Sequence, residues 1–265
     1  MSIRLVAVDI DGTLLDDDLV LCPHLMQKVS QLEVAGVGFT LATGRVFSSA
    51  ALVGRELGLA LPLIANGGAV VQEVTGRNLS HLVLSGELVV EALEYTRNWP
   101  AQRYLMTRDC IYAETGGAHA QAYSQRLRVP VEIAGKLEEV VEEGTTQLVI
   151  RTDQRHAGNQ ARCAQRRFAG RLAVQRTMPH LIEFMHQDAS KGKALLRLAA
   201  ALDLTPEQVM AVGDGINDLD MLEAAGMGVL VGNADPQLWK RADYVTEAHY
   251  HRGVMEALES FVNMG

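Results

Sequence analysis

The sequence predicts an α/β protein in which a doubly wound parallel sheet is interrupted by an inserted α+β domain. Over the first 80 residues, short runs rich in Val, Ile and Leu alternate with longer segments of helical spacing, which is typical of a parallel sheet. The same pattern resumes at Ser190, whereas the strand candidates between the two regions alternate apolar and polar residues. We therefore expect a discontinuous core at residues 1–84 and 187–265 and an inserted domain at residues 85–186.

The first half of the core begins with a continuous apolar run at residues 3–8, which fits a strand buried on both faces. The next segment has a roughly helical apolar stripe that ends at Gly36 and consists of Leu25, Val29, Leu32 and Val34. The other elements expected in this half are strands at residues 38–42 and 61–65, a helix at residues 46–57, and a β-hairpin at residues 69–73 and 79–84.

The inserted segment is richer in Arg, Gln and Glu than the core. Its expected strands lie at residues 103–106, 111–114, 147–151, 172–176 and 181–185, and its expected helices at residues 87–98, 119–127 and 156–168. The core then resumes with a helix from Ser190, a strand at residues 209–212, a helix at residues 218–225 and a strand at residues 228–231.

Composition excludes several classes of protein. With 48% hydrophobic and 21% charged residues among 265, the chain is globular, and its net charge of -8 without a basic run argues against a nucleic-acid partner. The sequence contains no run of about 18 apolar residues that would predict a membrane span. Asp9 and Asp11 stand where a signal peptide would have its apolar segment, so we expect no signal peptide. Three dispersed cysteines without a C-x-x-C pair predict neither disulfides nor a zinc site. We expect a cytoplasmic protein; its oligomeric state cannot be predicted from the sequence.

Two carboxylates follow the first predicted strand. Asp9 and Asp11 are two positions apart in an extended segment, so their side chains point the same way at an edge where open α/β sheets bind ligands. Such a pair suits a nucleophile beside a general acid/base, although a turn or helix cap is the simpler role for either residue alone. A calcium-binding loop is excluded, because Leu14 and Val20 stand where it needs Gly and Glu.

A second acidic cluster, Gly-Asp-Gly-Ile-Asn-Asp at residues 213–218, follows another predicted strand. Asp214 and Asp218 would repel the first pair unless a cation lay among them. An oxygen-only ligand set favours a hard ion, and Mg²⁺ fits best. A cap on the next helix is an alternative role for Asp218.

Two further segments are candidate anion sites. Thr43, Gly44 and Arg45 end a strand just before a helix, where a hydroxyl and free backbone amides can bind an anion, although Thr-Gly also makes ordinary turns. Lys191 and Lys193 stand at a helix start, where the macrodipole disfavours cations unless an anion compensates. We expect Lys191 to reach inward and Lys193 to be solvated. Neither a dinucleotide-binding nor a P-loop fingerprint occurs.

These segments, taken in order, resemble the four motifs of the haloacid dehalogenase superfamily. The motif residues are those at positions 8–14, Thr43-Gly44-Arg45, Ser190-Lys191-Gly192 and those at positions 213–218. The long insertion after the second motif and Asn66-Gly67 make the chain similar to the Cof-type phosphatases, which carry a large α/β cap. The resemblance implies a Rossmann-like core and Mg²⁺-dependent hydrolysis of phosphate monoesters.

The resemblance also implies residue roles. Asp9 would attack phosphorus, and Asp11 would protonate the leaving group and then activate water. Thr43 and Lys191 would hold the phosphoryl oxygens, with Gly44, Arg45 and Asn66 also on the substrate side and Asn66 at the phosphate-facing rim. Mg²⁺ would be bound by Asp9, Asp214 and the backbone carbonyl of Asp11, with Asn217 and Asp218 in supporting roles.

Two positions bear on how far the resemblance extends. Glu183 matches a glutamate often found in the family shortly before the lysine motif. Near the C-terminus, many relatives have an Asn followed by acidic residues, whereas residues 247–254 here read Glu-Ala-His-Tyr-His-Arg-Gly-Val.

The leading hypothesis is thus a phosphatase acting on small phosphorylated metabolites, with sugar phosphates as candidates. A phosphomutase would instead pass the phosphoryl group to a second hydroxyl. A phospho-accepting regulatory module also combines carboxylates, Thr and Lys around Mg²⁺, but such modules have about half this length and no inserted domain. A relative that only binds phosphate is the remaining alternative.

Overall fold

The computed structural model describes residues 2–16 and 18–263, and residues 1, 17, 264 and 265 of the expected core lie outside that part. Five parallel strands form the central sheet, which in spatial order are β14 (Tyr244–Val245), β13 (Met227–Leu230), β12 (Val209–Gly213), β1 (Leu5–Val8) and β2 (Gly38–Leu41). The chain adds β2 on one side of β1 and β12 to β14 on the other. The carboxyl ends of β1 and β12 therefore meet at a topological switch point, where open sheets bind ligands.

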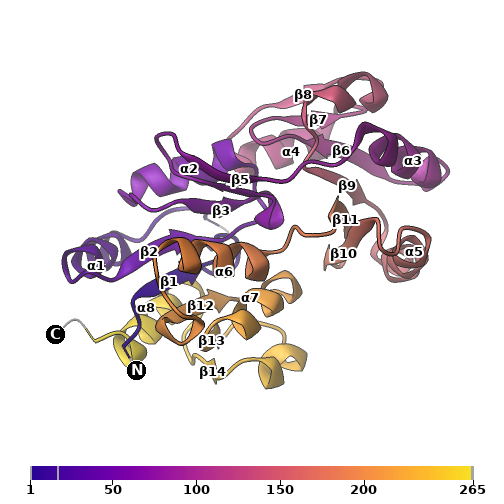
Figure 1. The fold of residues 1–265 in the computed structure, drawn as a ribbon. Helices are drawn as coiled ribbons and strands as arrows, with labels where there is room; N and C mark the ends of the chain where they lie inside the picture. The colour runs from indigo at the N-terminus through magenta and orange to yellow at the C-terminus, as the bar shows by residue number, and fades with distance from the viewer. Residues whose placement is uncertain (1, 17, 264–265) are drawn as a thin grey trace.

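Helices cover both faces of this sheet, because its strands are apolar on both faces. Val6 and Val8 of β1 belong to one buried cluster, and Leu5 and Ala7 belong to another. The first cluster is covered by α1 (Pro23–Val34), α2 (Phe47–Glu56) and α8 (Tyr250–Phe261), and the second by α6 (Lys191–Ala201) and α7 (Leu219–Ala224). Both ends of the chain lie on this core, on the side away from the insertion (Figure 1).

A second sheet of six strands is built from the insertion alone. Its spatial order is β10 (Leu172–Met178), β11 (Leu181–His186), β9 (Gln147–Arg151), β6 (Gln102–Met106), β7 (Ile111–Ala113) and β8 (Val131–Ile133). Apolar residues of α3 (Gly86–Thr96) and α5 (Gln154–Arg167) cover one face, and α4 (Ala118–Leu127) packs on the other. That second face also meets Val46 of the core, so it is the face turned toward the switch point. We call this insertion the cap.

A small antiparallel sheet lies beside the core: β3 (Leu63–Ala65), β4 (Val70–Gln72) and β5 (Asn78–His81). Short 3₁₀ helices are η1 (Asn66–Gly68), η2 (Leu137–Glu143), η3 (Pro206–Gln208), η4 (Ile216–Asp218) and η5 (Pro236–Arg241). Within the described ranges, no helix is both long and apolar enough to span a bilayer.

The predicted fold class is confirmed, and several details differ. The strand expected at residues 61–65 is not part of the five-stranded sheet: it contacts the end of β2 through an isolated bridge from Ala42 to Ile64 and through hydrogen bonds of Thr40 and Thr43 to its carbonyls. Val34 is 89% exposed, because it stands two residues, or about 200°, beyond the buried Leu32 on the helix. The prediction also missed β8, β14 and α8. The domain boundaries at residues 84/85 and 186/187 stay predictions.

Candidate functional site

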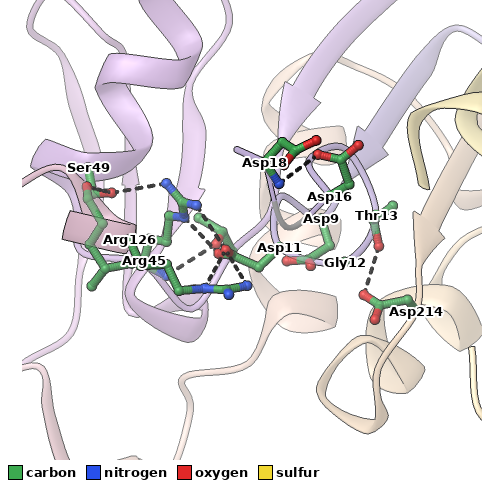
Figure 2. A network of polar contacts seen from close by, with 12 residues as sticks. Asp9, Asp11, Gly12, Thr13, Asp16, Asp18, Arg45, Ser49, Arg126 and Asp214 are labelled. Atoms are coloured by element: carbon green, nitrogen blue, oxygen red, sulfur yellow. Dashed lines mark hydrogen bonds and ion pairs between the residues drawn. The ribbon is translucent and has the colours of Figure 1, made fainter. Parts of the chain in front are cut away.

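The loop after β1 brings two aspartates to the switch point. Asp9 is 4% exposed, and Asp11 follows it in a tight turn in which Gly12 has a φ of +85°. A Cβ atom at Gly12 would lie 2.5 Å from Asp214 Oδ2, so glycine is required there both for its backbone conformation and for this close approach. Thr13 donates a hydrogen bond of 2.9 Å to Asp214 Oδ1 and joins this loop to the next (Figure 2).

The loop after β12 carries Asp214 and Asp218. Asp218 is fully buried, and its Oδ2 atom accepts hydrogen bonds from the backbone amides of Asp214 and Gly215 at 3.1 and 2.9 Å. The predicted cap on the following helix is wrong, because the Asp218 side chain makes no capping hydrogen bond to α7 and instead closes the start of η4. The other oxygen, Oδ1, lies 2.6 Å from Lys191 Nζ. Asp218 therefore shapes the loop and takes part in the charged cluster.

Lys191 lies buried between two carboxylates. Its Nζ atom lies 2.6 Å from Asp9 Oδ1 and 2.6 Å from Asp218 Oδ1. Burial disfavours the ammonium form, but the charges of Asp218 and Asp9 outweigh it and raise the pKa of Lys191 above its ordinary value. These two carboxylates stabilise a cation at a helix start, as expected from its position. Lys193 is exposed and pairs with Asp188 at 3.1 Å.

Three carboxylates converge as a candidate metal site. Oxygens of Asp9, Asp214 and Asp218 lie within 4.8 Å of one another. Burial raises the pKa of Asp9 well above its usual range, and Lys191 opposes this effect while the neighbouring aspartates add to it. Burial and the charge of Asp218 likewise raise the pKa of Asp214 to about 6. Carboxylates that repel one another in an oxygen-only cluster fit a hard divalent cation such as Mg²⁺.

Asp11 does not join this trio through its side chain. Its carboxylate accepts hydrogen bonds from Arg45 Nε at 2.7 Å and Nη2 at 2.8 Å, and from Arg126 Nε at 3.1 Å. Burial alone would raise the pKa of Asp11, but the two arginines lower it below its usual value. Arg126 belongs to α4, so this cluster directly joins the cap to the aspartate-bearing loop after β1 (Figure 2).

Sequence reasoning missed Arg126, because nothing in a helix 115 positions away marks it as a partner of Asp11. It also missed Asn233, whose Nδ2 donates to the carbonyl of Gly12 and whose Oδ1 accepts from the Tyr250 amide, both at 2.8 Å. The divergent C-terminal segment thus supports the aspartate loop through its backbone.

The side chains from both halves of the molecule enclose a cavity of about 520 Å³, a size typical of small-molecule sites. Among the predicted residues, it is lined by Asp9, Asp11, Thr43, Gly44, Arg45, Asp214 and Asn217. Thr43 is 1% exposed, and its hydroxyl accepts a hydrogen bond from the Arg45 amide at 3.2 Å. Lys191 borders a small adjoining cavity with Gly44 and Asn217. The cap contributes Tyr104, Tyr123, Arg151, His180 and Glu183, among others.

Asn66 lies elsewhere than the phosphate-facing rim that the sequence suggested. It is fully buried and does not line the cavity. Its Oδ1 accepts from the Phe47 amide at 3.1 Å, and its Nδ2 donates to the Thr107 carbonyl at 2.8 Å and to Thr146 Oγ1 at 2.9 Å. Because these hydrogen bonds use its amide on groups of both core and cap, Asn66 joins the two parts rather than facing a ligand.

We expect Asn66→Ala to reduce the free energy of unfolding by about 1–3 kcal/mol, since it removes three buried hydrogen bonds, one within the core and two to the cap, although the Phe47 amide keeps its hydrogen bond to the Arg108 carbonyl. Urea denaturation measures this loss, with the exposed Asn159→Ala as the control, for which we expect a change within about 0.5 kcal/mol. A higher KM for the substrate together with an unchanged free energy of unfolding would instead support a position of Asn66 at the phosphate-facing rim.

Comparison with known proteins agrees with this geometry. A family model described as haloacid dehalogenase-like hydrolase matches residues 6–258. The chain is 30% identical to the HMP-PP phosphatase of Serratia proteamaculans, over 89% of this chain and 86% of that protein. It is 26% identical to a phosphoglycolate phosphatase of Methanothermobacter thermautotrophicus, over 98% and 99% of the two chains. A solved haloacid dehalogenase-like hydrolase from B. subtilis has the same fold, with a TM-score of 0.87 at 24% identity over 98% of this chain and 100% of that one. The family match covers nearly the whole chain, and the protein therefore belongs to the haloacid dehalogenase-like hydrolases.

Proposed function

We propose that this phosphatase hydrolyses small phosphorylated metabolites, sugar phosphates among them, in a Mg²⁺-dependent reaction through an aspartyl-phosphate on Asp9. The observation that carries the proposal is the convergence of Asp9, Lys191, Asp214 and Asp218 at the switch point, where Asp9 and Asp214 line a cavity that side chains of the cap also line. The names of two relatives, an HMP-PP phosphatase and a phosphoglycolate phosphatase, support a small phosphorylated substrate.

In the first step, a carboxylate oxygen of Asp9 attacks phosphorus, and the bond between phosphorus and the leaving oxygen breaks. Lys191 holds Asp9 Oδ1, whereas no described residue donates a hydrogen bond to Oδ2, which leaves that oxygen available for attack. Asp11 must be protonated for this step, against the lowering of its pKa by Arg45 and Arg126, and it then gives its proton to the leaving oxygen, so that the product departs as a neutral alcohol. The Thr43 hydroxyl and the adjacent Gly44 amide bind phosphoryl oxygens at the cavity floor.

In the second step, Asp11 takes a proton from water, which attacks phosphorus and breaks the bond to Asp9. Phosphate leaves, and both aspartates return to their starting forms. The arginine-paired Asp11 of the structure is the ionised form that this step needs as its base. A Mg²⁺ ion held by Asp9 and Asp214, with Asp218 and Asn217 beside them, would neutralise charge on the phosphoryl oxygens.

The test is phosphate release from p-nitrophenyl phosphate and a panel of sugar phosphates, with Mg²⁺ or with EDTA. We expect release that EDTA abolishes and added Mg²⁺ restores. Release that persists in EDTA would contradict the metal requirement. Transfer to a second hydroxyl only with a bisphosphate activator would support the phosphomutase, and a stable phosphorylated chain without turnover would support the regulatory module.

The cytoplasmic location also stays a prediction.

A further inference from the structure

The cap end of the cavity holds an arginine that pairs with no acidic side chain among the described residues. Most arginines of the cap pair with a carboxylate; among the described residues the exceptions are Arg151, Arg162, Arg166 and Arg176. Of these four, Arg151 alone lines the cavity. It is also half-buried, so its guanidinium is placed at a ligand site without a protein counter-ion.

The imidazoles of His119 and His180 lie near this arginine. Arg151 Nη1 lies 3.4 Å from Nε2 of His119 in the first turn of α4. The His180 carbonyl accepts a hydrogen bond from the Thr152 amide, which holds the turn between β10 and β11 beside the end of β9. Burial, Arg151 and His119 together lower the pKa of His180, as expected in a site of positive potential.

Strand register shows how far Arg151 lies from the end of β9 that packs on the core. On β9, Gln147, Val149 and Arg151 share one face. The Gln147 end packs against Gly67 of the core, and Arg151 lies four residues further out, or about 13 Å. Between the two ends, Val149 lies opposite Glu183 on β11 and Tyr104 on β6 in the register of the sheet. Asp9 and Arg151 line the same cavity, so a substrate whose phosphoryl group lies at Asp9 can direct the far end of its leaving group toward Arg151.

We infer that the leaving group of the substrate carries a second anionic group, a carboxylate or a phosphate, at the end away from the scissile bond, and that Arg151 binds it with His119 and His180. This inference rests on the proposed phosphatase function and adds the substrate class. Glu183 does not compete for the arginine, because it accepts hydrogen bonds from Thr177 at 2.8 Å and Gln147 at 3.3 Å. A guanidinium can donate two parallel hydrogen bonds to the oxygens of a carboxylate or of a phosphate.

The experiment compares substrates that differ in one charged group. 6-Phosphogluconate is paired with sorbitol 6-phosphate for the carboxylate, and fructose 1,6-bisphosphate with fructose 6-phosphate for the second phosphate. We expect the wild-type kcat/KM to favour the anionic member of at least one pair by about 10- to 100-fold, the range of a charge-assisted hydrogen bond. The pair that shows this preference identifies the source of the charge.

We expect Arg151→Gln to bring that ratio close to one and Arg151→Lys to retain part of it. The matched control is Arg166→Gln, the same charge change on the exposed side of α5, which should keep the wild-type ratio. The inference would be overturned if the wild type had equal kcat/KM values for both members of each pair, or if Arg151→Gln lowered the two values equally. Hydrolysis of p-nitrophenyl phosphate in the same experiment would still support the phosphatase function. No release from any substrate, p-nitrophenyl phosphate included, would overturn both.

Discussion

Asp9→Asn is expected to lower kcat by roughly 10⁴-fold or more, because an amide oxygen cannot replace the carboxylate that forms the covalent intermediate. The variant should nevertheless fold. Burial and three neighbouring aspartates raise the pKa of Asp9, which means that its charged form is disfavoured in the folded protein, and a neutral side chain removes that repulsion. Phosphate release and urea denaturation on the same preparation measure both effects.

The control for this variant is Asp18→Asn, which removes an exposed carboxylate from the same loop, outside the three aspartates of the candidate metal site. We expect it to retain wild-type activity. Comparable activity in Asp9→Asn and Asp18→Asn would contradict the assignment of Asp9 as nucleophile, whereas unfolding of Asp9→Asn would contradict the account of its charge environment.

Lys191→Met should affect stability and activity together. The substitution keeps much of the side-chain volume but leaves Asp9 and Asp218 buried without their cation, a loss that costs about 3–5 kcal/mol in the free energy of unfolding. We also expect kcat to fall by about 10²- to 10³-fold, because charge on the phosphoryl group loses a stabilising cation. Urea denaturation in EDTA and steady-state kinetics in Mg²⁺ measure the two losses separately.

Lys193→Met provides a matched control on the same helix. Its ammonium is about half exposed and pairs with Asp188 near the surface, where an ion pair contributes about 0–1 kcal/mol. We expect this variant to resemble the wild type in both measurements. If Lys191→Met also resembled the wild type, the buried lysine would have neither the structural nor the catalytic role assigned to it.

The sequence predicted the core and its central residues because these depend on local patterns. Apolar runs mark strands buried on both faces, and the residues that follow such strands must lie at one edge of the sheet. The strand pattern alone therefore assigns Asp9 and Asp214 to one site, although they are far apart in the chain. The inward orientation of Lys191 followed from the cost of a cation at a helix start, which requires a nearby anion.

Positions set by packing between cap and core could not be predicted in the same way. The sequence around Arg126 and Arg151 does not indicate that they line the site, since their neighbours depend on how the cap packs on the core. The family resemblance implied a position for Asn66 at the phosphate-facing rim, whereas in the structure its backbone is left-handed, with φ of +50°, and its side-chain amide donates to Thr107 and Thr146 of the cap. β14 contains two residues and has too little sequence for any periodicity.

The most direct test of catalysis through Asp9 is to trap the phosphorylated enzyme. Asp11→Asn lacks both the acid of the first step and the base of the second, so the substrate is ³²P-labelled p-nitrophenyl phosphate, whose leaving group departs as a stable anion without an acid. Mixing the two and quenching in acid should leave label on the peptide that contains Asp9. The label should be released by hydroxylamine, as an acyl phosphate is, and should be absent from Asp9→Asn. Label on another residue, or wild-type turnover without any labelled chain in Asp11→Asn, would contradict the assignment of Asp9 as the nucleophile.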